Sequence, residues 1–141
     1  MIDSSLYIGQ KMVRTKKIAV DVIDSFAAVS EDYNPLHIDE KKAAEGPFGE
    51  RIVHGIYTVG LISGIIGMQL PGEGTIYLEQ HAKFLKPIFV GDTISVIVEI
   101  TDILNAEKGI LKLRTFAINQ DDIIVVDGYA VVKTERKVVK K

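Results

Sequence analysis

The sequence contains no cysteine and no tryptophan, and only three of its 141 residues are histidine. Without cysteine the chain can form no disulfide, no thiolate metal site and no cysteine nucleophile. The histidines, His37, His54 and His81, are irregularly spaced and match no metal-binding template. The formal net charge is −2, and no basic stripe stands out before the C-terminal tail. We therefore expect neither a bound metal ion nor a nucleic acid partner.

Aspartate, glutamate, lysine and arginine are absent from Ile52 to Leu70, a run close to the roughly 20 residues that span a bilayer. This run contains several polar side chains and four glycines. It therefore predicts a helix, from Ile52 to about Gln69, that the protein itself buries, and no membrane span. The N-terminus lacks a basic segment followed by an apolar run, so we expect no signal peptide and a cytoplasmic location.

The first half of the chain has the signals of two shorter helices. The length suits one domain, and the hydrophobic share of 47% and charged share of 26% are those of a globular protein. Asp21 is expected to cap a helix over residues 22–30, and Asp39 a short helix over residues 40–44. The apolar positions of the first of these helices are Val22, Phe26 and Val29, and Ile23 widens this face.

The second half is rich in Ile, Val, Thr, Phe and Tyr, with turn signals between the apolar segments. The expected strands are residues 75–85, 93–104, 109–119 and 123–133, and residues 12–19 are expected to form a first strand. One face of the strand over residues 93–104 is expected to hold Ile94, Val96, Val98 and Ile100. One face of the strand over residues 109–119 is expected to hold Leu111, Leu113, Thr115 and Ala117. The close spacing predicts an antiparallel meander. A helix that is apolar on all sides must be buried, so we predict an α+β domain whose antiparallel sheet wraps around the long helix.

The segment from Asp32 to Asp39, Asp-Tyr-Asn-Pro-Leu-His-Ile-Asp, places a carboxylate and an imidazole five residues apart with a proline between them. Asp and Asn bond to nearby backbone groups and Pro fixes φ, so the segment predicts a rigid turn. Such a turn can aim Asp32 and His37 at one water molecule, which is the minimal requirement for general acid–base addition or removal of water. Taken alone, the segment is more typical of a plain loop between two helices.

Gly55 lies in the first turn of the predicted long helix. Backbone N–H groups there have no partner inside the helix and lie at the positive end of its dipole. A glycine also leaves room for a ligand, so the Gly55 N–H could bind a carbonyl oxygen as it does in an oxyanion site. His54, just before it, is expected to be a hydrogen-bonded core residue. Close packing alone accounts for the other glycines of this helix, Gly60, Gly64 and Gly67.

Four segments follow one another in an order that is specific to a known family. They are Phe26-x-x-Val29-Ser30-x-Asp32-x-Asn34-Pro35-Leu36-His37 with Ala43 after it, Phe48-x-x-x-Ile52-Val53-His54-Gly55, Ile76-Tyr77-Leu78, and Phe84-x-x-Pro87-Ile88-Phe89-Val90-Gly91-Asp92. Their combination resembles the hydratase 2 motif of the (R)-specific enoyl-CoA hydratases, the MaoC-like dehydratases, over residues 13–133. One departure is Glu31, where the motif usually has glycine. It could alter the geometry of the loop or the access of water, but it replaces no reacting group.

The resemblance implies a single domain over residues 1–141, with a hot-dog fold whose core spans about residues 13–133. It also implies a homodimer with the active site near the subunit interface. Members of the family add water reversibly to trans-2-enoyl thioesters and form (R)-3-hydroxyacyl thioesters, without a metal or redox cofactor. The expected enzyme is therefore a hydro-lyase, and its expected substrate is an acyl-CoA or the corresponding thioester of an acyl carrier protein.

The resemblance assigns roles to five residues. Asp32 and His37 match the catalytic pair of the family. Gly55 matches the residue whose backbone N–H binds the thioester oxygen. Asn34 matches the asparagine that orients the loop or the water, and Ser63 lies where a close relative has a polar residue near the site.

Two other functions stay open at this point. One is an acyl-CoA thioesterase on the same fold, which would also use a carboxylate to activate water. The other is a non-catalytic subunit that binds acyl thioesters. The length of the acyl chain is open too, because Leu61, Ile62, Ile65 and Leu78 could line a pocket or fill the core. Lys83 and Lys86 are expected to be solvated, although they could also contact phosphate groups.

Overall fold

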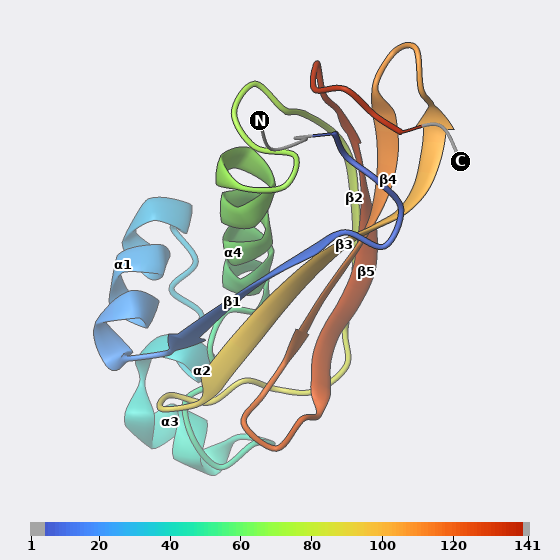
Figure 1. Ribbon diagram of the computed structural model, residues 1–141. Helices are drawn as coiled ribbons and strands as arrows, with labels where there is room; N and C mark the ends of the chain where they lie inside the picture. Colours follow the sequence, from blue (N-terminus) through green and yellow to red (C-terminus); the bar gives the residue numbers. More distant parts are fainter. Residues whose placement is uncertain (1–4, 140–141) are drawn as a thin grey trace.

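The computed structural model describes residues 5–139 (Figure 1). Residues 1–4 and 140–141 lie outside the described residues. They include both ends of the expected single domain and the first residues of the N-terminus, where no signal peptide is expected. The helices and strands are, in chain order, β1 (Lys11–Lys17), α1 (Val20–Ser30), α2 (Pro35–Ile38), α3 (Glu40–Glu45), α4 (Gly55–Met68), β2 (Ile76–Phe84), β3 (Thr93–Asn105), β4 (Ile110–Ile118) and β5 (Ile124–Lys133).

The five strands form one antiparallel sheet in the order β1-β3-β4-β5-β2. The predicted meander is confirmed for β3, β4 and β5, but it is wrong for β2, which pairs with β5 at the far edge. A tight turn cannot connect β2 to β3 in this order, and the connection is the longer loop over residues 85–92. The strands β1 and β2 are consequently the two edges of the sheet.

Helix α4 packs against one face of this sheet, and α1 lies on the other side of α4 (Figure 1). The predicted alternation on β3 and β4 is confirmed, because Ile94, Val96, Val98, Ile100, Leu111, Leu113, Thr115 and Ala117 are all buried. Their apolar members join Ile62, Ile65 and Ile66 of α4 in one core. Burial of this apolar surface is the main driving force of the fold.

Helix α4 is not buried on all sides, contrary to the prediction. Ile56 is 53% exposed and Met68 is 77% exposed, because the sheet of this chain covers only part of the helix. The helix has fourteen residues, which is fewer than the roughly 20 needed to cross a bilayer. Within residues 5–139, no helix combines the length and the apolar character of a membrane span.

The predicted cap is confirmed for one of the two short helices and is wrong for the other. Asp39 caps α3, since its side chain accepts a hydrogen bond of 3.0 Å from the Lys42 N–H. Asp21 does not cap α1, because the helix begins earlier, at Val20, and Asp21 lies in its first turn. The apolar face of α1 is also shifted. Ile23 and Ala27 are buried, whereas Val29 is 85% exposed.

The segment that leads into α4 is held by backbone hydrogen bonds on both sides. The Ile52 N–H donates to Leu36 O at 3.1 Å, and the Val53 N–H donates to Ile88 O at 2.7 Å. These bonds join α2, the entrance to α4 and the β2–β3 connection, which are distant in the sequence. Their meeting point is the place where the predicted functional residues gather.

Candidate active site

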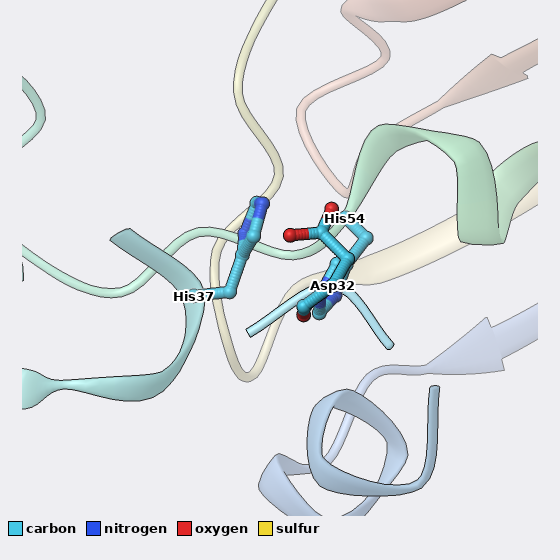
Figure 2. Close-up of side chains that lie close together, drawn as sticks. All are labelled: Asp32, His37 and His54. Atoms are coloured by element: carbon cyan, nitrogen blue, oxygen red, sulfur yellow. The ribbon is translucent and has the colours of Figure 1, made fainter. Parts of the chain in front are cut away.

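The turn that carries Asp32 has the chemistry expected from its sequence. The Asp32 Oδ1 accepts a hydrogen bond of 3.1 Å from the Asn34 N–H, and the Asn34 Oδ1 accepts one of 3.1 Å from the Leu36 N–H. Asn34 is thereby the N-cap of α2, and Pro35 occupies its first position. The sequence did not predict this short helix. Because α2 is a single turn, it directs His37 back toward Asp32 (Figure 2).

Two bonds fix the position of His37. Its Nδ1 lies 2.7 Å from the backbone oxygen of Ile52, and a carbonyl can only accept, so the proton is on Nδ1. The Nε2 atom, by contrast, makes no hydrogen bond with any residue between 5 and 139. The backbone oxygen of His37 accepts a bond of 2.5 Å from Arg51 Nε, and Arg51 also pairs with Asp24 at 3.2 Å. His37 therefore has a defined ring orientation with one nitrogen left for chemistry.

His54 lies behind both of these residues and is only 1% exposed. Its Nε2 donates a hydrogen bond of 2.9 Å to the backbone oxygen of Asp32. Its ring stacks on that of His37 with 3.9 Å between the centroids and 25° between the planes. Figure 2 shows the Asp32 carboxylate directed toward the His37 ring, with His54 beside them. The expected core position of His54 is confirmed, and its ring also forms one side of the site.

Polar atoms of Asp32, His37 and His54 lie within 4.8 Å of one another. Each imidazole already uses one nitrogen in a bond to a backbone oxygen. A metal ion could thus be bound only by His37 Nε2, an Asp32 oxygen and the buried Nδ1 of His54. The expectation that no metal is bound stays a prediction from the sequence.

The predicted long helix begins at Gly55 and not at Ile52, and Gly55 lies in its first turn, as expected. In the part of the chain that the structure describes, its N–H group donates to no other residue. This group lies at the positive end of the α4 dipole, so it can donate to a negatively polarised oxygen.

Asp32, His37, His54 and Gly55 line one cavity of about 490 Å³, a volume within the usual range of ligand sites. The other lining residues are Phe48, Ile52, Val53, Ile56, Phe84, Leu85, Lys86, Pro87, Ile88 and Val126. Except for Lys86, these are apolar. An apolar chain can thus lie beside one carboxylate, one free imidazole nitrogen and one free backbone N–H.

Some predicted residues do not reach this cavity. Ser63 lies on the exposed face of α4 and does not line it, so its role at the site stays a prediction. Ile62 and Ile65 belong to the core, and Leu61 packs against it. Leu78 is 49% exposed on the edge strand β2. Of the two lysines, Lys86 lines the cavity and Lys83 does not.

Two aromatic residues without a predicted role, Phe48 and Phe84, also line the cavity. Both stand in the motif segments that carry the family resemblance, so the signal was present. Their contacts, however, depend on the docking of the β2–β3 connection against α4, which no local pattern reports.

The family described as "MaoC like domain" matches residues 5–119. The chain belongs to the MaoC-like family. It is 44% identical to the (R)-specific enoyl-CoA hydratase of Aeromonas caviae over 133 residues, covering 94% of this chain and 98% of the relative. It is 37% identical to the 3-hydroxybutyryl-CoA dehydratase of Methylorubrum extorquens over 132 residues, covering 94% and 83% of the two chains.

Solved structures of MaoC-like proteins have the same fold. The (R)-hydratase of Aeromonas caviae involved in PHA biosynthesis superimposes with a TM-score of 0.87 at 45% identity, covering 92% of this chain and 97% of that one. An unliganded R-hydratase of Pseudomonas aeruginosa gives a TM-score of 0.86 at 41% identity, covering 92% and 83%. The predicted α+β hot-dog fold is thus confirmed.

Proposed function

We propose that this protein is a hydro-lyase that adds water reversibly to trans-2-enoyl-CoA and forms (R)-3-hydroxyacyl-CoA. The observation that carries the proposal is the meeting of Asp32, the free His37 Nε2 and the free Gly55 N–H in one largely apolar cavity. The strong similarity to (R)-specific enoyl-CoA hydratases supports the same reaction. Neither a thioesterase nor a non-catalytic subunit is favoured by any contact in this site.

The dyad holds the reacting water between two acceptors. An Asp32 oxygen and His37 Nε2 each accept one hydrogen of the water, which leaves an oxygen lone pair free to attack C3 of the enoyl group. As the C–O bond forms, Asp32 takes one proton from the water. The other hydrogen stays on the oxygen and becomes that of the 3-hydroxyl group. The proton passes from Asp32 to His37 Nε2, and His37 delivers it to C2, which returns both groups to their starting state. One water is added in total, and delivery from one side makes the addition syn.

The Gly55 N–H binds the thioester oxygen, on which negative charge grows as C3 is attacked. This donor lies at the first turn of α4, where the helix dipole adds to its effect. Loss of one donor of this kind typically lowers kcat by about 10²–10³-fold. The apolar walls keep other water away from the enolate, which strengthens the interaction.

We further infer that the protein forms a homodimer through β2. This strand is an edge of the sheet, and Ile76 and Leu78 on it are 56% and 49% exposed. An exposed apolar edge is a template for pairing with a second strand. Phe84 at the end of β2 lines the cavity, so pairing there would bring the partner subunit close to the site. Sedimentation equilibrium of the protein and of Leu78→Lys tests this, since the variant is expected to be monomeric.

The substrate is expected to be an acyl-CoA, with the thioester of an acyl carrier protein as the alternative, and no further cofactor is needed for the steps above. A cytoplasmic location and the length of the acyl chain stay predictions from the sequence. Hydration assays with enoyl-CoA substrates of increasing length measure which acyl chains the enzyme accepts.

Hydration of crotonyl-CoA by Asp32→Asn and His37→Gln tests the dyad. Each variant removes one acid–base group, so kcat is expected to fall by about 10²–10⁴-fold. Asp121→Asn is the matched control, since Asp121 is exposed and does not line the cavity. A folded Asp32 or His37 variant with nearly wild-type kcat would refute the dyad. Release of free CoA without a chiral 3-hydroxyacyl product would indicate a thioesterase instead.

A further inference from the structure

His54 is the one histidine near the cavity that takes no part in the proton transfers proposed above. It is the N-cap residue of α4, directly before Gly55, yet its side chain makes no capping bond. The ring is instead turned toward the turn that carries Asp32 and toward α2. Its role must therefore come from what the ring contacts there.

The ring contacts both members of the dyad in different ways. Through Nε2 it donates a hydrogen bond of 2.9 Å to the backbone oxygen of Asp32. Through its face it stacks on the His37 ring at 3.9 Å. It also packs against Phe26 in a tilted arrangement, with 4.9 Å between the ring centroids. The position of one ring consequently sets where both reacting groups lie.

The remaining nitrogen of His54 is unusual. Its Nδ1 is fully buried and has no hydrogen-bond partner among residues 5–139. Buried polar atoms without a partner are rare and destabilising, so this nitrogen offsets part of the stability that the other contacts of the ring contribute. A phenyl ring would supply the stacking face without the orphaned nitrogen, and an amide would supply the donor without the face. The imidazole combines the donor and the flat surface in one small ring.

We propose that His54 is a positioning residue, which holds the Asp32 turn and the His37 ring at the separation that one water molecule can bridge. The inference rests on the proposed roles of Asp32 and His37. It adds a direct link between the dyad and Gly55, because His54 and Gly55 are adjacent in the chain. A displacement of about 1 Å of catalytic groups can lower a rate by about 100-fold, so a residue without chemistry of its own can control kcat in this way.

Two variants separate the two contacts of His54. His54→Phe keeps the stacking face and loses the donor, whereas His54→Gln keeps a donor at similar reach and loses the face. We expect each to lower kcat for crotonyl-CoA by about tenfold or more, with KM changed by less than about threefold. Ile65→Val, a change in the core away from the cavity, controls for loss of stability and is expected to keep kcat.

His54→Phe is also made in a variant that lacks one member of the dyad. This double variant gives a readout that a merely structural role would not affect. In His37→Gln, the addition of His54→Phe is expected to cost less than about threefold in kcat, because the geometry no longer serves the complete dyad. Wild-type kcat in either His54 variant, or an equal loss in both backgrounds, would overturn the inference. If Asp32→Asn and His37→Gln are themselves fully active, the proposed function fails first, and this outcome is distinguishable from the others.

Discussion

The ring of Phe84 lies where a side chain at Gly55 would have to be. A Cβ atom built on Gly55 would be 2.6 Å from Cδ1 and 2.9 Å from Cε1 of Phe84, closer than carbon atoms approach one another. The space beside Gly55 is thus filled by the protein itself, from the end of β2. This corrects the expectation that the glycine leaves room for a ligand at that point. Its N–H is the group that stays free for a substrate oxygen.

Replacement of Gly55 by alanine is therefore expected to displace Phe84. Gly55→Ala should lower the free energy of unfolding by about 1–3 kcal/mol, as overpacking does, and should lower kcat/KM. The double variant Gly55→Ala/Phe84→Leu should recover part of both losses, because leucine lacks the ring edge that meets the new methyl group. Urea unfolding and crotonyl-CoA hydration measure the two quantities.

Gly60→Ala is the matched control in the same helix. The close packing expected at Gly60 is wrong for the described residues, because a Cβ there meets none of their atoms within 4 Å. Alanine at this position is therefore expected to stabilise the protein by up to about 1 kcal/mol. If the Gly55 variant is equally defective with and without Phe84→Leu, the ring is not the obstacle and the glycine is required for another reason.

The contact between Gly55 and Phe84 is also a feature that could not be predicted from the sequence. Alternation identified the buried faces of β3 and β4, and Asp39 identified the start of α3, because these signals act over a few residues. The turn at Asp32 was likewise local, and so was the place of Gly55 in the first turn of the long helix, although the helix starts at Gly55 and not at the predicted Ile52. The placement of β2 at the edge and the approach of Phe84 to Gly55 depend on how a long connection docks, and propensities carry no such information. The stacking of His54 on His37 was missed for the same reason.

Glu31 departs from the family motif, and its backbone explains why glycine is usual there. Glu31 follows the last residue of α1 with φ of 63°, in the left-handed region that terminates many helices. A residue with a side chain pays roughly 1 kcal/mol or more for this conformation, which glycine does not.

Glu31→Gly is therefore expected to raise the free energy of unfolding by about 1 kcal/mol, measured by urea denaturation. Asp122→Gly is a useful comparison, because Asp122 also has a positive φ, of 58°, but aspartate tolerates it better. The gain at Asp122 should be the smaller one. Equal stability of Glu31→Gly and the wild-type protein would show that the glutamate is not strained.

Arg51 connects α1 to the backbone of His37, and its two bonds differ in importance. Its side chain is 11% exposed, whereas that of its ionic partner Asp24 is 62% exposed. Exposed ion pairs contribute little, so Asp24→Asn is expected to leave kcat and Tm nearly unchanged. Arg51→Met removes the donor to the His37 oxygen as well and should lower kcat by about tenfold through displacement of α2. Equal effects of the two substitutions would contradict this distinction.

Tyr77 gives the fold a dependence on alkaline pH. Burial raises the pKa of Tyr77 from 10.0 to about 12, and the phenol donates a hydrogen bond to the Gln80 side chain that ionisation would break. Above pH 10 the unfolded chain loses the Tyr77 proton while the folded protein keeps it. The folded state then binds more protons than the unfolded state, so stability falls as the pH rises from 10 toward 12.

Tyr77→Phe should remove this part of the pH dependence, because phenylalanine does not ionise. The free energy of unfolding, measured in urea at pH 8, 10 and 11, is expected to fall less steeply for the variant than for the wild-type protein. Tyr33→Phe is the matched control, since Tyr33 is 60% exposed and its removal should leave the slope unchanged. An identical slope for Tyr77→Phe and the wild type would mean that the phenol ionises as readily in the folded protein as in the unfolded chain.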